Sequence, residues 1–227
     1  MLEYLILWIS GISIVTFFGS WYARKFDKPD ALIGLYVAFV LAANILAVKI
    51  GAYDLGFATF FAPAATLFFS VTFLMTDIVN EKFGRAETQK MILIALLAQI
   101  ALQFFVWLAI TIPPAPFWPN QAAFELLFGF TPRIAIAGWI AFLISESLDA
   151  HIFAWFKEKT KGKKLWMRNV LSSLPSMAID SVIFVTLAFY GVLPVEPIII
   201  GLIVTKWLVG IVDIPFMYAN RWILHRK

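Results

Sequence analysis

Seven stretches of mostly apolar residues, each long enough to form a membrane-spanning helix, account for most of this 227-residue chain. Such a helix needs about 20 apolar residues to cross the hydrocarbon core of a bilayer. We place the stretches at 3–23, 31–50, 57–79, 88–112, 133–156, 167–191 and 197–220. Charged residues make up 14% of the chain, whereas about 25% is usual in soluble domains. The sequence therefore predicts an all-α integral membrane protein, a bundle of about seven transmembrane helices.

Basic residues are concentrated in alternate loops between these stretches. Most of the 18 Lys and Arg residues fall at 24–28, 82–90, 157–168 and 221–227. Loops rich in Lys and Arg stay on the cytoplasmic side of a membrane. The pattern therefore predicts a multi-pass protein of the cell (plasma) membrane, with its N-terminus outside and its C-terminus in the cytoplasm.

The loop at 113–132, which this orientation places outside, has four prolines before Asn120. Prolines at this density exclude a continuous helix. Phe117 and Trp118 of the loop suit the headgroup region of a membrane. Two interpretations stay open: a loop that lies along the lipid headgroups, and a lid over an outer vestibule.

Acidic side chains lie inside the apolar stretches. A charged side chain at the centre of a membrane helix costs about 2.5–3.5 kcal/mol, so it normally faces the bundle interior or a water-filled cavity. Glu146 and Asp149 are three residues apart on one helix face, and Phe153 continues the same stripe. Two carboxylates beside an aromatic ring suit a flat ligand that is rich in N–H groups. The same two carboxylates could equally form ion pairs with lysines and bind no ligand.

Further polar residues lie at similar depth in four other stretches. Arg168, Ser172 and Asp180 share one face of a helix, because they are spaced by four and eight residues. The candidates in these four stretches are Asn44, Asp77, Arg168, Ser172, Asp180 and Lys206. The convergence of five stretches predicts a polar pocket for a small ligand, with Asn44, Asp77, Asp180 and Lys206 among its ligand-binding or gating groups.

Each of these residues also has a structural interpretation. The amide of Asn44 could join two helices through a hydrogen bond rather than bind a ligand. Lys206 could neutralise Asp180, Glu146 or Asp213 in an ion pair with no other role. The sequence alone leaves both alternatives open.

The residues that are absent exclude several classes of function. The chain has no cysteine and two histidines, so we expect no metal site and no bound cofactor. It has no phosphate-binding loop, nucleophile elbow or zinc-protease motif, so we expect neither an ATPase nor another enzyme. Its net charge of +4 is dispersed over loops, so we expect no nucleic-acid partner.

Several blocks of sequence together resemble the queuosine precursor transporters, also called the vitamin uptake transporter family. These blocks are NILAVKI at 44–50, TDIVNEKFGR at 76–85, PPAPFWP at 113–119, and the region 145–184 from SESLDAHIFAWFK to SMAIDSVIF. The resemblance covers roughly 31–220. It implies a six-helix transporter core at 31–227, related to the substrate-binding components of ECF vitamin transporters, with an added transmembrane helix at 1–30.

The resemblance also implies a function. Members of the family import 7-deazaguanine precursors of a modified tRNA base. The resemblance implies that the chain salvages such a nucleobase by alternating access. The base would be the 7-cyano form, the 7-aminomethyl form or full queuine. The alternative is an ECF-type substrate-binding subunit, for a vitamin or a nucleobase, that needs a separate ATPase module. The expected partners are a purine-like small molecule and the lipid bilayer, and a homo-oligomer is left open.

Overall fold

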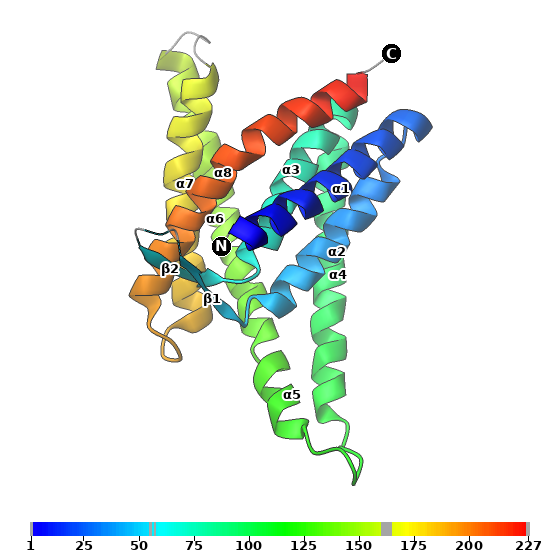
Figure 1. The fold of residues 1–227 in the computed structure, drawn as a ribbon, viewed down its shortest axis with the longest axis vertical. Coiled ribbons are helices and arrows are strands. Elements are labelled where there is room, and N and C mark those ends of the chain that lie inside the picture. Colours follow the sequence, from blue (N-terminus) through cyan, green and yellow to red (C-terminus); the bar gives the residue numbers. More distant parts are fainter. Residues whose placement is uncertain (1, 55, 57, 160–164, 226–227) are drawn as a thin grey trace.

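Seven long helices, one short helix and one β-hairpin make up the described part of the chain (Figure 1). The computed structural model describes residues 2–54, 56, 58–159 and 165–225. The helices are α1 (Leu2–Phe26), α2 (Asp30–Leu46), α3 (Thr66–Phe83), α4 (Arg85–Thr111), α5 (Gln121–Phe128), α6 (Thr131–Lys159), α7 (Leu165–Phe189) and α8 (Val195–His225). The long helices follow the predicted stretches in order, so the predicted class, a helical membrane protein, is confirmed.

Four segments are long and apolar enough to cross a membrane, judged by length and composition among the described residues. They are Ile6–Phe26, Arg85–Thr111, Gln121–Ser145 and Val195–Leu224. Two shorter apolar helices, Asp30–Leu46 and Leu174–Phe189, accompany them. The count of seven membrane crossings and the orientation of the termini stay predictions.

A β-hairpin accompanies the predicted helices and corrects the bounds of the third predicted stretch. Strands β1 (Ile50–Asp54) and β2 (Thr59–Pro63) pair in antiparallel register, with Ile50 opposite Pro63 and Asp54 opposite Thr59. The third predicted stretch, 57–79, therefore begins as a strand, and its helix starts only at Thr66. The hairpin packs on α8 so closely that a Cβ at Gly201 would overlap the backbone of Phe61.

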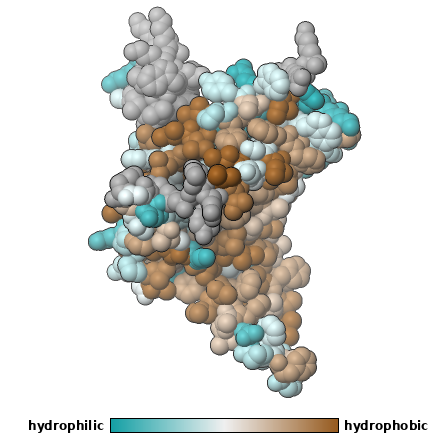
Figure 2. Space-filling model, viewed as in Figure 1, coloured by the Kyte–Doolittle hydropathy of each residue, from teal (hydrophilic) through white to brown (hydrophobic). Residues whose placement is uncertain are grey.

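Apolar residues cover most of the central and right part of the face shown in Figure 2, and hydrophilic residues lie toward its upper margin, its left edge and its lower tip. Large apolar side chains such as Leu7, Phe105 and Ile211 are more than 60% exposed. A soluble protein rarely exposes so large an apolar surface. Lipid is the natural cover for this surface.

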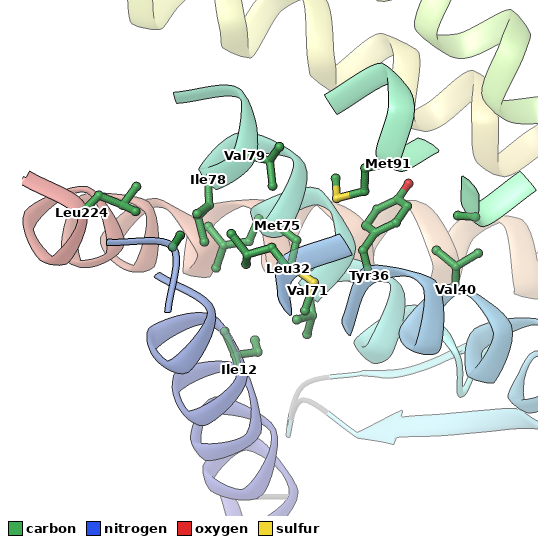
Figure 3. Close-up of a cluster of buried hydrophobic side chains, with 13 residues drawn as sticks. Ile12, Leu32, Tyr36, Val40, Val71, Met75, Ile78, Val79, Met91 and Leu224 are labelled. Atoms are coloured by element: carbon green, nitrogen blue, oxygen red, sulfur yellow. The ribbon is translucent and has the colours of Figure 1, made fainter. Parts of the chain in front are cut away.

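Two clusters of buried apolar side chains hold the helices together. The first joins α1, α2, α3, α4 and the end of α8, and Ile12, Leu32, Met75 and Met91 are fully buried in it (Figure 3). The second joins the hairpin to α2, α6, α7 and α8, and is rich in alanine: Ala43, Ala47, Ala62, Ala65, Ala137 and Ala188. Small residues let membrane helices approach closely, and the resulting van der Waals contacts help to drive helix association in lipid.

The connections between helices follow their sequence signals. Gly84, with φ at 83°, alone separates α3 from α4, a backbone angle that glycine adopts without strain. Helix α4 ends at Thr111, two residues before the first proline of the 113–132 loop. This loop and α5 lie at the lower end of the molecule in Figure 1. The structure describes all of 112–130, and none of these residues lines the cavity of about 620 Å³ between the helices. The lid interpretation therefore gains no structural support.

Candidate functional site

A cavity of about 620 Å³ lies between the two apolar clusters and is lined by residues of α2, α3, α4, α6, α7 and α8. Ligand sites in proteins usually have volumes of about 300–1,000 Å³, mostly apolar walls and a few polar groups that fix orientation. The walls here include the aromatic rings of Phe73, Trp139, Phe142 and Phe184. The cavity thus has the size and the lining of a site for one small, flat molecule.

One wall of the cavity carries an ion pair between Asp180 of α7 and Lys206 of α8. The two side chains are 20% and 13% exposed. Ser145 Oγ of α6 lies 3.3 Å from Asp180 Oδ1 and donates a hydrogen bond to it. The pair therefore joins three helices, and both of its members reach the cavity.

A second wall carries three polar side chains from α2, α4 and α6. Asn44 Nδ2 donates to Gln99 Oε1 at 2.8 Å, and Trp139 Nε1 donates to the same oxygen at 2.9 Å. All three residues line the cavity, and Asn44 is only 9% exposed. One carboxamide oxygen therefore holds three helices together at this point.

Two carboxylates, Asp77 of α3 and Asp213 of α8, mark the junction between this cavity and a smaller one of about 330 Å³. Both line both cavities. Arg221 lines the smaller cavity, and its Nε lies 3.0 Å from Glu81 Oε1. Since α8 runs from the main cavity through the junction toward the C-terminus, the smaller cavity lies on the side that the basic residues predict to be cytoplasmic.

The structure brings four of the nine candidate residues to the main cavity: Asn44, Asp77, Asp180 and Lys206. The side chains of the other five lie outside the described residues: Glu146, Asp149, Phe153, Arg168 and Ser172. Of the three proposed partners of Lys206, the structure pairs it with Asp180. The predicted role of these residues in binding stays a prediction.

Two residues central to the cavity wall, Gln99 and Trp139, are not among those predicted from the sequence. Gln99 lies in the middle of an apolar stretch, at the depth that drew attention to Asn44. Its position was therefore an available signal. Trp139 gave no such signal, because tryptophan in a membrane segment is commonly an interface anchor or a packing residue. Asp213 was considered only as a partner for Lys206, whereas the structure places it on the cavity wall.

Comparison with known proteins decides the family. Residues 63–220 match the model of the family described as "Putative vitamin uptake transporter". The chain belongs to this family. The matched region begins at the end of β2 and includes every helix from α3 to most of α8, so it contains five of the six helices that line the cavity. The resemblance found in the sequence motifs is thereby confirmed.

Two curated relatives support membership of the vitamin uptake transporter family. The chain is 30% identical over 206 residues to a "Probable queuosine precursor transporter" of Bacillus subtilis (strain 168), covering 86% of this chain and 87% of the relative. It is 27% identical over 134 residues to a protein of the same description from Haemophilus influenzae, covering 58% of this chain and 54% of that relative. No solved structure gives a significant match.

Proposed function

We propose that the chain imports a queuosine precursor, a 7-deazaguanine base, across the plasma membrane by alternating access around the main cavity. The observation that carries the proposal is the cavity itself: six helices line a cavity of about 620 Å³ with both hydrogen-bonding and aromatic residues. The names of the relatives supply the substrate class. The volume and lining of the cavity support binding of such a substrate there.

The chemistry of the cavity suits such a base. A 7-deazaguanine has an exocyclic amine and ring N–H groups, which donate to carboxylates and to amide oxygens. Its carbonyl, and the nitrile of the 7-cyano form, accept from donors such as the Lys206 ammonium. The flat ring system suits the faces of Trp139, Phe142 and Phe184.

The proposed binding and gating groups come from five helices. Asn44, Asp77, Asp180 and Lys206 line the cavity. To them we add the predicted residues whose side chains are outside the described part of the chain: Glu146, Asp149, Phe153, Arg168 and Ser172. We assign residues 31–227 to the transporter core and 1–30 to an added helix.

Alternating access needs helices that bend. Pro175 lies inside α7 and Pro215 inside α8, and each removes one backbone hydrogen bond of its helix. Asp180 follows Pro175 on α7, and Lys206 precedes Pro215 on α8. Bending of either helix at its proline would therefore change the geometry of the ion pair. This supports a site that rearranges between outward-open and inward-open states.

The test is uptake of radiolabelled 7-cyano-7-deazaguanine by cells that cannot synthesise the base. Expression of the chain should restore uptake, and Asp180→Asn and Asp77→Asn should each reduce it at least tenfold at equal membrane levels. Asp27→Asn is the matched control, because the Asp27 side chain is 87% exposed and asparagine tolerates its φ of 53°. Uptake that is unchanged in both cavity variants would refute the site.

Purified protein in liposomes separates the carrier from the alternative. A carrier should accumulate or equilibrate the base without any other protein. Uptake that appears only after an ATPase module is added would show instead an ECF-type binding subunit. The absence of binding by the pure chain would contradict both.

A further inference from the structure

The orientation of the Gln99 and Asn44 amides is fixed by Trp139. An indole N–H only donates, so the atom of Gln99 that lies 2.9 Å from Trp139 Nε1 must be the carbonyl oxygen. The atom of Asn44 that lies 2.8 Å from the same oxygen must then be the NH₂ group. Amide orientation usually has to be assigned from such a network, and here the donor-only indole settles both residues.

Two polar atoms remain after these bonds are made. They are Gln99 Nε2, a donor, and Asn44 Oδ1, an acceptor, and no other described group bonds either of them. Both residues line the cavity. Because one hydrogen bond joins the two amides, this donor and this acceptor lie on neighbouring residues of the cavity wall.

We propose that Gln99 and Asn44 determine substrate specificity by reading the lactam edge of the base, a ring C=O next to a ring N–H. Gln99 Nε2 donates to the C=O, and the ring N–H donates to Asn44 Oδ1. Trp139 is the positioning residue that keeps the two amides in this orientation. This inference rests on the proposed function, since it assigns the contacts of the same ligand in the same cavity.

The competing explanation is that the three side chains only hold α2, α4 and α6 together. Interhelical hydrogen bonds between amides have this role in many membrane proteins. It predicts that substitutions lower stability and weaken all ligands equally. A role in specificity predicts instead that substitutions change the ratio of affinities for two ligands that differ at the lactam edge.

The test measures the dissociation constants of 7-cyano-7-deazaguanine and of its O6-methyl ether on the purified full-length protein. Methylation removes the ring N–H and blocks the carbonyl, and it leaves the rest of the base unchanged. The unmodified protein should bind the lactam at least tenfold more tightly than the ether. Equal affinities for the two forms would overturn the inference without the use of any variant.

Variants then assign the effect to residues. Gln99→Glu keeps an oxygen for Trp139 and Asn44 but replaces the NH₂ donor with an acceptor, so the lactam-to-ether ratio should fall below threefold. Asn44→Ala should lower the ratio by removing the acceptor. Trp139→Phe keeps an aromatic ring but frees the amides to turn, and should lower the ratio at least threefold.

Gln103→Glu is the matched control. Gln103 is one turn further along α4, accepts from Thr131 Oγ1 at 3.0 Å, and does not line the cavity. Its substitution should leave the ratio unchanged. A constant ratio in Gln99→Glu and Asn44→Ala, accompanied by lower stability, would show a structural role only, and the proposed function would still stand. Failure of the unmodified protein to bind either form would refute the proposed function itself.

Discussion

The ion pair between Asp180 and Lys206 gives the sharpest separation of a structural role from a role in binding. Lys206→Met removes the cation and leaves the carboxylate in a mostly apolar setting. Loss of one partner from a buried pair costs about 3–5 kcal/mol. Because the cavity leaves the Asp180 side chain 20% exposed, water there partly solvates the remaining charge, and we expect about 2–4 kcal/mol.

The predicted loss is measurable as a change in melting temperature of the detergent-solubilised protein. One kcal/mol shifts the melting temperature of a chain of this length by about 2–4 °C, so Lys206→Met should melt about 5–15 °C lower. Asp180→Asn combined with Lys206→Met removes both charges, and should recover most of this loss. Lys90→Met breaks a surface pair with Glu87 in which Lys90 is 64% exposed, and should have an effect of no more than about 1 kcal/mol.

Binding of the base distinguishes the two roles. If the pair contacts substrate, the double variant should regain stability but bind 7-cyano-7-deazaguanine at least tenfold more weakly, a loss of about 1.4 kcal/mol or more. A double variant that regains both stability and wild-type affinity would show that the pair only joins α7 to α8. That result would remove Asp180 and Lys206 from the proposed site.

Three further predictions concern charge and packing. The described cavity lining has three carboxylates and one ammonium, so the cationic 7-aminomethyl base should bind more tightly than the 7-cyano base. In equilibrium binding, Asp213→Asn should reduce that preference about tenfold, or about 1.4 kcal/mol. An unchanged preference would exclude Asp213 from contact with the amine. Gly201→Ala should destabilise the protein by about 1–3 kcal/mol in thermal unfolding, because the new Cβ meets the backbone of β2. Gly11→Ala should not, because a Cβ added at Gly11 meets nothing within 4 Å. Equal losses of stability in the two variants would contradict the close packing of β2 on α8. Asn220 is fully buried, and its Oδ1 accepts a hydrogen bond of 2.7 Å from Ser20 Oγ of α1. Asn220→Ala should therefore lower stability by about 0.6–1.7 kcal/mol. An unchanged melting temperature would show that this contact does not hold α1 in place.

The sequence predicted the helices well because their signal is simple. A stretch of about 20 apolar residues has few alternatives to a helix in lipid, where every backbone polar group must be bonded within the segment. The β-hairpin was missed because residues 50–63, IGAYDLGFATFFAP, are as apolar as the helices around them. A short apolar run does not distinguish strand from helix by its periodicity. The signals are few: Asp54 and Gly56 mark the turn, and the proline at 63 marks the strand end.

The candidate site was predicted in part for a similar reason. Asp77, Asp180 and Lys206 attract attention in a sequence because a charge in lipid is costly, and the structure places all three on one cavity. Gln99 and Trp139 carry no charge and attract less attention. Gln99 offered the same signal as Asn44, a polar side chain in the middle of an apolar stretch, whereas Trp139 offered none. Their importance comes from a shared hydrogen-bonded oxygen, a relation between α4 and α6 that only the three-dimensional arrangement shows.

Protection of a single introduced cysteine tests most directly whether the cavity is the substrate site. The chain has no cysteine of its own, so Gly138→Cys gives one thiol on the cavity wall, at a position where an added Cβ meets nothing within 4 Å. Glu125→Cys on the exposed face of α5 is the control. Saturating 7-deazaguanine base should slow alkylation of the cavity thiol by N-ethylmaleimide at least tenfold and leave the control rate unchanged. Equal alkylation of the cavity thiol with and without bound base would contradict the account.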